Sequence, residues 1–214
     1  MNLKNKAIIL NAPKEAGKNV IADRISELTG ASHSEFKQHL YDCTATLFNV
    51  PREFLLALLT DRITKEVPSS YFVIKYKEYK KLRDITKGGV KSSNMGDMVD
   101  IAISPREALI YTSEIVIKPR MGDSYFGKVV ANNIDTDKGV VFSDGGFIEE
   151  VEEVQKKVGK SNLYVVQFSR RGTSFDGDSR SYLNTSSGVN TLVTTNNKTI
   201  DDIVREILDW VGSK

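Results

Sequence analysis

The chain has 214 residues, 40% of them hydrophobic, which is enough for one sizeable core in one domain or in a core domain with a small insertion. Its 30 basic and 28 acidic residues leave a net charge of +2, so whole-molecule charge indicates neither a nucleic-acid nor a membrane partner. The single Cys43 excludes an intramolecular disulfide, and no apolar stretch approaches the length of a membrane span. With no signal-peptide pattern at the start, these features predict a reducing, cytoplasmic setting.

In chain order, short apolar runs alternate with longer amphipathic stretches. The apolar runs predict strands at 7–10, 139–143, 163–169 and 191–195. The amphipathic stretches predict helices at about 18–29, 34–48, 51–64, 105–118, 124–134, 146–158 and 198–212. This alternation predicts an α/β fold, with a parallel central sheet flanked by helices on both faces.

Several helix starts carry local signals. Pro105 follows Ser104 in a predicted first turn, and Pro51 lies in another with Asn49 just ahead of it. Thr199 is a predicted cap for "IDDIVREILDWV", whose apolar residues recur at helical spacing. The sequence therefore predicts both the last helix and the residue at which it begins.

Two polar segments interrupt this pattern. Residues 84–101 and 170–188 are rich in Gly, Ser and Asp and show weak periodicity. We expect both to be mobile excursions at one end of the sheet. The sequence shows no internal repeat and no linker, so one domain over 1–214 is expected.

The stretch "AIILNAPKEAGKNVIADRI" (7–25) predicts a strand, a turn and a helix, with Gly17 and Lys18 at the helix start. This is the order of a phosphate-binding loop, where backbone N–H groups wrap phosphates and a lysine adds charge. Ala12 stands where the motif has its first Gly, and Asn19 replaces the hydroxyl residue that binds Mg²⁺. The alternative is a plain strand-to-helix turn in which Lys18 is a solvated surface charge.

The two departures have different expected effects. Ala12 is tolerated if its backbone φ is negative and strained if φ is positive. The Asn19 amide is longer than a hydroxyl, so a water-mediated metal contact is expected.

Asp144 ends the apolar run "GVVFSD". Ligands of open α/β sheets gather beyond the carboxyl ends of the strands, so a carboxylate there is expected to face a nucleotide crevice. The alternative is an N-cap for the helix that is predicted to begin near Gly146.

Three arginines, Arg170, Arg171 and Arg180, lie on the Gly-containing segment after the strand at 163–169. Phosphoryl transfer needs positioning and compensation of phosphate charge, which arginine forks, a lysine and a metal supply. The segment is therefore interpreted as a lid. The alternative is a solvated loop whose arginines and aspartates, Asp176 and Asp178, neutralise one another.

Over nearly the whole chain, the order of these segments resembles the bacteriophage deoxynucleoside monophosphate kinases of the P-loop nucleotide kinase group. The resemblance rests on several short matches, among them "APKEAGKNVIADRI", "SEFKQHLYDCTATLFNV", "LLTDRITKE", "SPREALIYTSEIV", "GVVFSDGGFIEEVEEVQK" and "YVVQFSRRGTSFDGDSRSYLN". It implies phosphoryl transfer from ATP with Mg²⁺ to a deoxynucleoside monophosphate (dNMP). It also implies a helical substrate-side insertion over 30–103, a lid over 170–188, and the cytoplasm of a host cell as the location.

The resemblance implies a role for each site residue. Lys18 would hold the β and γ phosphates, Asp144 and Asn19 would organise Mg²⁺, and the lid arginines Arg170, Arg171 and Arg180 would close over the transferring group. The nucleotide would be bound by Ala16, Gly17, Lys18, Asn19 and Val20, with Asn196 and Asn197 at its base. The acceptor would be bound by Lys37, Arg62, Lys65, Arg106 and Phe147.

One departure leaves the acceptor open. After the aspartate the monophosphate kinases of this group generally present an Arg, whereas here Gly145, Gly146 and Phe147 follow Asp144. A larger acceptor stacked on Phe147 would suit this change. The alternative acceptor is a hydroxymethyl group on a DNA base, as in related phage kinases of 5-hydroxymethyluracil. "KYKEYKKLR" (75–83) would then contact the DNA backbone, unless it is an ordinary solvated helix.

Other chemistry has little support in the sequence. His33, His39 and Cys43 lack enough partners for a metal site, and no Ser/His/Asp signature is present. A third alternative is a non-catalytic nucleotide-binding module, which would explain Ala12 and Asn19 most simply. The expected partners are ATP, a dNMP or a modified DNA base, and a second copy in a homodimer, with no membrane partner.

Overall fold

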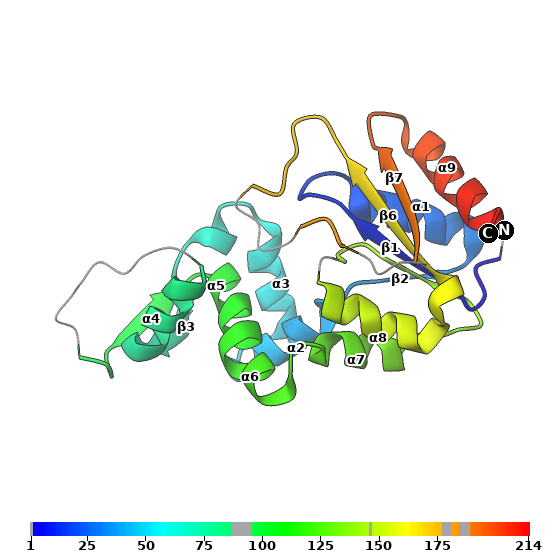
Figure 1. The fold of residues 1–214 in the computed structure, drawn as a ribbon. Coiled ribbons are helices and arrows are strands. Elements are labelled where there is room, and N and C mark those ends of the chain that lie inside the picture. Colours follow the sequence, from blue (N-terminus) through cyan, green and yellow to red (C-terminus); the bar gives the residue numbers. More distant parts are fainter. Residues whose placement is uncertain (1, 87–95, 146, 177–180, 185–188) are drawn as a thin grey trace. The chain divides into compact units, whose positions relative to one another are not determined.

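The computed structural model describes residues 2–86, 96–145, 147–176, 181–184 and 189–214. Contacts divide the chain into two compact units (Figure 1). Unit 1 contains the residues up to Lys37 and those from Ser124 onward, and unit 2 contains Gln38–Asp123. Unit 2 overlaps the range 30–103 of the expected substrate-side insertion, and the substrate role of that insertion stays a prediction.

Unit 1 is built on a parallel sheet with the strand order β2-β5-β1-β6-β7. Its strands are β1 (Ala7–Asn11), β2 (Ser32–Ser34), β5 (Val140–Phe142), β6 (Leu163–Ser169) and β7 (Asn190–Thr195). The predicted α/β fold with a parallel central sheet is confirmed. The helix prediction is wrong for residues 34–37, because the helix predicted over 34–48 begins only at Gln38 and the short strand β2 precedes it.

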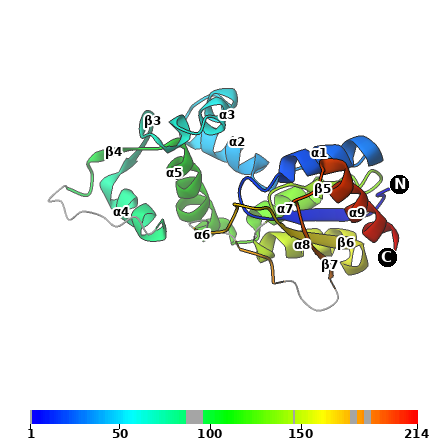
Figure 2. The same cartoon turned by 90° about the horizontal axis from the view of Figure 1, so that it is seen from above.

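Helices cover both faces of this sheet, as Figures 1 and 2 show. The helices are α1 (Lys18–Thr29), α7 (Tyr125–Asn132), α8 (Ile148–Val158) and α9 (Ile200–Gly212), with a 3₁₀ turn, η3 (Lys160–Asn162), before β6. Successive β1 side chains point to opposite faces. Ile8 and Leu10 pack with α1 and α9, whereas Ala7 and Ile9 pack with α7 and α8.

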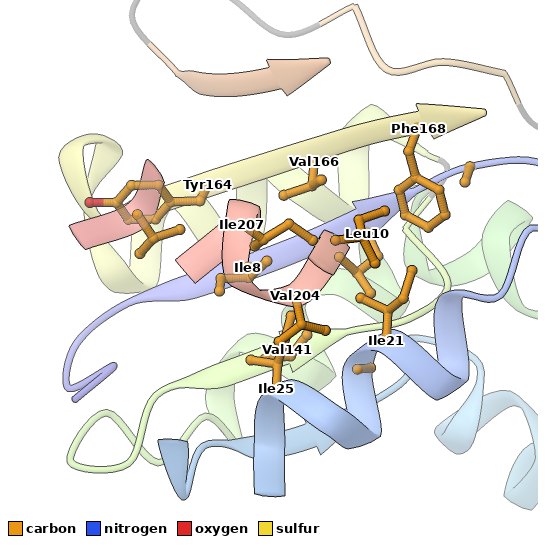
Figure 3. Close-up of a cluster of buried hydrophobic side chains, with 14 of the residues drawn as sticks. Ile8, Leu10, Ile21, Ile25, Val141, Tyr164, Val166, Phe168, Val204 and Ile207 are labelled. Atoms are coloured by element: carbon orange, nitrogen blue, oxygen red, sulfur yellow. The ribbon is translucent and has the colours of Figure 1, made fainter. Parts of the chain in front are cut away.

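Figure 3 shows the first of these clusters. Ile8 and Leu10 of β1 meet Ile21 of α1 and Ile207 of α9, and all four side chains are fully buried. Burying one such side chain stabilises the fold by about 1.5–3 kcal/mol. This packing fixes the position at which β1 ends and α1 begins.

The connections of two neighbouring strands diverge at the carboxyl end of β1. This strand leads into α1 on one face of the sheet, and its neighbour β5 leads into α8 on the other. Strands whose connections leave on opposite faces form a topological switch point, where α/β proteins bind ligands.

Unit 2 contains the two-stranded antiparallel sheet of β3 (Ser69–Lys75) and β4 (Asp100–Ile103), neither of which was predicted. Its other elements are α2 (Gln38–Leu47), α3 (Arg52–Thr60), η1 (Thr64–Glu66), α4 (Tyr76–Ile85), α5 (Pro105–Ile110), η2 (Tyr111–Ile117) and α6 (Lys118–Met121). Its core contains Leu55, Phe72, Leu82 and Ile103, which are fully buried. Residues 105–121 are helical throughout, with π-helical geometry at η2.

Two of the predicted helix starts are confirmed. The Ser104 side chain accepts the Glu107 N–H, and the Glu107 side chain accepts the Ser104 N–H, a complete capping box before Pro105. Thr199 caps α9 by accepting the Asp202 N–H. The prediction for Pro51 is wrong, because this residue is the cap that precedes α3 and does not lie in the first turn of that helix.

Across the described ranges, no helix is both long enough and apolar enough to cross a membrane.

Candidate phosphate-binding site

The turn between β1 and α1, residues 12–17, is called the phosphate loop below. Two of its residues have positive φ, Glu15 at 65° and Gly17 at 93°. Ala12 is not among the described residues with positive φ, and its methyl is buried in the core beside α1. The replacement of the first Gly by Ala12 therefore creates no backbone strain, because this turn takes its left-handed residues from positions 15 and 17.

Lys18 folds back over the phosphate loop. Its Nζ donates to Ala12 O and to Pro13 O, each at 2.7 Å, and only 9% of the residue is exposed. The interpretation of Lys18 as a solvated surface charge is wrong. The contacts hold its ammonium group beside the backbone of the loop, at the start of α1.

The start of α1 adds to this positive charge. Its cap residue is Gly17, no side chain caps it, and its first turn contains no acidic residue. The first N–H groups of a helix and its dipole attract anions. Asn19 and Val20 are exposed in this first turn. The local structure thus presents a lysine and a helix N-terminus together.

The loop between β7 and α9 closes one side of the phosphate loop. Asn196 is buried, and its Nδ2 donates to Ala16 O at 2.6 Å. A Cβ on Gly17 would lie 2.8 Å from the same Nδ2, so only glycine fits there without a shift. Asn197 Oδ1 accepts the Arg171 N–H at 2.9 Å. The predicted base-side asparagines therefore tie three segments together, and their contact with a base stays a prediction.

The end of β6 contributes the first lid arginines. Arg170 Nη1 donates to Glu15 O at 3.4 Å, and the Arg170 and Arg171 side chains are exposed. Asp176 accepts from the hydroxyl of Ser174 at 2.7 Å. Arg180 and Asp178 lie outside the described residues. Arg170 is thus already next to the phosphate loop.

Asp144 lies at the end of β5 and is buried, with 8% of the residue exposed. Its Oδ1 accepts the Phe36 N–H at 2.8 Å, and its Oδ2 accepts the Lys37 N–H at 3.1 Å. Burial raises the pKa of its carboxyl above 3.8, and the Lys37 charge opposes that rise. The N-cap alternative is wrong, because the cap residue of α8 is Phe147 and no side chain caps that helix.

The residues at this site fit a magnesium ion by the chemistry of their donors. An ionised carboxylate has about four lone-pair positions, so Asp144 can hold both backbone N–H groups and still accept from a metal-bound water. Asn19 offers an amide oxygen, and Mg²⁺ prefers oxygen ligands and keeps several waters. No group of three or more metal-ligating side chains occurs in the described part of the chain. Substrate phosphates would have to complete such a site.

Gly145 has a packing reason to be glycine. A Cβ there would lie 2.1 Å from Ile9 Cγ2, and its carbonyl accepts from Asn11 Nδ2 at 3.1 Å. An arginine therefore cannot stand at position 145 in this fold. Phe147 is half-buried before α8, and Gly146 lies outside the described residues.

The predicted acceptor residues lie in both units. Lys37 belongs to unit 1, where its Nζ pairs with Glu35 Oε1 at 3.0 Å. Arg62, Lys65 and Arg106 belong to unit 2. Arg106 pairs with Glu66 at 3.0 Å, and the two side chains are 42% and 48% exposed, so the guanidinium can exchange this partner for a phosphate. All four stay predictions as acceptor ligands.

The stretch at 75–83 is mostly helix α4. Tyr76 is buried and Tyr79 packs against the unit 2 core, so the interleaved tyrosines are not a stacking surface. Four of its five cations have acidic partners, Lys75 with Asp100, Lys80 with Asp97, Lys81 with Glu78 and Arg83 with Glu107. The packed tyrosines favour the ordinary helix, whereas the exposed lysine pairs can exchange a carboxylate for a phosphate and do not decide between the two.

Sequence reasoning missed several polar residues at this edge of the sheet. Asn11 is fully buried at the end of β1, and its side chain contacts Gly145, Ser181 and Leu183. A polar residue that ends an apolar strand was the available signal. His33, Glu35 and Ser143 also meet there, through the strand β2 that the apolar pattern did not reveal.

Comparison with known proteins yields structural similarity alone. No protein-family model and no curated protein matches the chain. A gluconokinase from Sinorhizobium meliloti 1021 is similar in structure, with a TM-score of 0.43 and 12% identity over 100% of this chain and 94% of that chain. An unliganded sugar kinase from Janibacter sp. HTCC2649 has a TM-score of 0.39 and 8% identity over 97% and 94%. At these TM-scores neither similarity adds to what the strand order itself shows.

Proposed function

We propose that this chain is an ATP- and Mg²⁺-dependent phosphotransferase of the P-loop kinase type, with a deoxynucleoside monophosphate as acceptor. The observation that carries the proposal is Lys18, which is held by two carbonyls of the phosphate loop at the uncapped start of α1. A lysine beside a helix N-terminus at a switch point is an arrangement suited to the phosphates of a nucleotide.

The chain's own residues then have distinct tasks. Lys18 and the first N–H groups of α1 bind the phosphates of ATP, and Arg170 stabilises the charge of the transferring group. Bound Mg²⁺ would neutralise phosphate charge, with Asp144 and Asn19 holding its water ligands. The transfer requires no nucleophilic side chain, because the acceptor supplies the attacking oxygen.

The proposed binding of the acceptor depends on positively charged side chains. Lys37, Arg62, Lys65 and Arg106 are the residues that we propose for the monophosphate, since ammonium and guanidinium groups bind phosphate by charge-assisted hydrogen bonds. Two arguments for a DNA-base acceptor are weaker than the sequence indicated, because Gly145 has a packing reason to be glycine and Tyr79 of α4 packs against the unit 2 core. A homodimer stays a prediction that sedimentation would test.

The deciding experiment offers radiolabelled ATP with each of the four dNMPs and, in parallel, duplex DNA with 5-hydroxymethyluracil. We expect label on a dNMP, and none when Lys18→Ala replaces the parent. Label on the DNA alone would overturn the acceptor. ATP binding without transfer to any acceptor would support the non-catalytic module. Asn19→Thr should keep or raise activity if Asn19 only substitutes for the usual hydroxyl.

A further inference from the structure

A second carboxylate, Glu35, lies beside Asp144 at the carboxyl edge of the sheet. The parallel pairing of β2 with β5 sets Ser34 opposite Phe142, so Glu35 and Ser143 both follow directly after their strands. The Ser143 N–H donates to Ser34 O at 3.3 Å and continues this pairing. Glu35 therefore lies at the edge where the proposed reaction takes place.

Glu35 is held in place from several sides. Its Oε1 accepts from Lys37 Nζ at 3.0 Å and from Ser143 Oγ at 3.4 Å, and 12% of its side chain is exposed. Phe36, the next residue, stacks on Phe142 with ring centroids 4.6 Å apart. The two N–H groups that follow Glu35 are bound by Asp144.

Two further residues support Ser143. His33 Nε2 lies 2.8 Å from Ser143 Oγ, and His33 Nδ1 lies 2.7 Å from Asp23 Oδ1. Asp23, His33, Ser143 and Glu35 thus form one continuous hydrogen-bonded series, called the polar chain below. It has the residue order of a Ser-His-Asp triad, but Ser143 is only 1% exposed, so a substrate carbonyl cannot reach its hydroxyl.

The polar chain ends on Glu35, so its function depends on what the Glu35 carboxylate can bind. The ion pair of Glu35 with Lys37 contributes little net stability, because the lysine side chain is 39% exposed and solvent screens the attraction. A carboxylate fixed in orientation is instead well suited to accept a hydrogen bond from a ligand hydroxyl, and such buried polar contacts give strong discrimination against a ligand without the hydroxyl.

We propose that Glu35 is an acceptor-binding residue that accepts a hydrogen bond from a hydroxyl group of the acceptor, and that Ser143 and His33 are positioning residues for it. The inference rests on the proposed function and deepens it. The hydroxyl can belong to the deoxyribose of a dNMP or to a hydroxymethyl base. Both present the same chemistry to the carboxylate.

The test is calorimetric binding, which does not require turnover. One arm compares each dNMP with its 2′,3′-dideoxy analogue, and the other compares an oligonucleotide containing 5-hydroxymethyluracil with the same oligonucleotide containing thymine. In one arm the parent protein should prefer the hydroxyl-bearing ligand at least roughly tenfold, as expected for a hydrogen bond to a charged group. Glu35→Ala should bind the two ligands with about equal affinity, because the hydrogen bond to the hydroxyl is lost.

A matched control is available on α8. Glu153 is also nearly buried, with 13% of its side chain exposed, and pairs with Lys156 at 2.7 Å. Glu153→Ala should leave the preference unchanged. Ser143→Ala should reduce it less than Glu35→Ala, because the Ser143 contact is long, and should weaken binding of the dideoxy ligand very little. A purely structural role would weaken both ligands equally.

The outcomes separate this inference from the proposed function. A preference that survives in Glu35→Ala, or no preference in either arm, would overturn the role of Glu35. The thermal stabilisation of the same variants by ATP reports on Lys18 and the phosphate loop independently. If Glu35→Ala keeps that stabilisation and its parent-like circular dichroism, the loss of preference cannot be assigned to misfolding.

Discussion

Asn11 and Gln167 are register partners on β1 and β6, and their side-chain amides hold the backbone of Leu183 from both sides. The Leu183 N–H donates to Asn11 Oδ1 at 2.8 Å, and Gln167 Nε2 donates to Leu183 O at 2.6 Å. Asn11 Nδ2 also donates to Ser181 O at 3.1 Å. The chain that returns from the predicted lid is thereby fastened to the two central strands, next to the phosphate loop.

This attachment predicts a cost when Asn11 is removed. Asn11→Ala should lower the free energy of unfolding by about 1–3 kcal/mol, because buried backbone groups lose their partners. Cleavage within 170–184 by a protease should accelerate as well. Urea unfolding and limited proteolysis measure the two effects. Asn133→Ala, which removes an exposed amide directly after α7, is the control, and an equal effect there would contradict the account.

Asp144 predicts a pH dependence with a definite sign. Its pKa in the folded state is raised by burial, so the folded protein binds this proton more tightly than the unfolded chain does. The stability contributed by the group is therefore present below the unfolded value of 3.8 and is lost as the pH rises toward the folded pKa. Asp144→Asn cannot titrate. The stability of the parent relative to this variant should therefore fall as the pH rises above that unfolded value.

Urea unfolding in metal-free buffer at several pH values checks this prediction. The variant also opposes an amide N–H₂ to the Lys37 N–H, which costs about 1–3 kcal/mol at every pH. The informative quantity is therefore how the difference in unfolding free energy between the parent and Asp144→Asn changes with pH. A difference that stays constant or grows toward neutral pH would contradict the role of burial.

The part of this fold that follows a simple apolar pattern could be predicted. The strands β1, β5, β6 and β7 are apolar enough to be recognised, and their helices follow the usual period. The strand β2 reads "SHS" and has no apolar run, so periodicity could not reveal it. With β2 missing, the meeting of Glu35 with Ser143 could not be foreseen, because strand register brings together residues that are far apart in the sequence.

The residues of the candidate site likewise fall into those that the sequence could predict and those that it could not. Gly17 and Lys18 could be found from their spacing, and Asp144 from its place at a strand end. The role of Gly145 could not, since only the position of Ile9 shows that a side chain has no room there. The carboxylate of Asp144 likewise binds N–H groups on a segment that is distant in sequence. Long-range packing therefore decides these roles.

Substitution of Glu15 in the phosphate loop is expected to have two separable effects. Its φ of 65° is left-handed, which costs a non-glycine residue about 1–2 kcal/mol. Its carboxylate also places a negative charge in a loop proposed to bind phosphates. Glu15→Gln should raise ATP affinity by removing charge. Glu15→Gly should do so too and should also raise the melting temperature.

Calorimetry and thermal unfolding of both variants check these effects. The pair serves as its own control, because only the glycine variant relieves the backbone. Unchanged ATP affinity in Glu15→Gln would show that the side chain does not face the phosphates.

Arg170 predicts an effect on the rate of transfer. If its guanidinium contacts the transferring group only in the closed state, Arg170→Ala should lower kcat at least roughly tenfold and change ATP affinity much less. Arg170→Lys should rescue partly, because it restores the charge without the planar fork. Arg205→Ala, at an exposed ion pair on α9, is the control. Unchanged single-turnover rates in Arg170→Ala would leave this arginine as a surface residue.

The central claim is that Lys18 and the phosphate loop bind the phosphates of ATP, and thermal unfolding with and without ATP and Mg²⁺ tests it most directly. The parent should melt at a higher temperature with the nucleotide, by the linkage between binding and stability. Lys18→Ala should abolish that increase while it retains the circular dichroism of the parent. An increase as large in Lys18→Ala as in the parent would contradict the account.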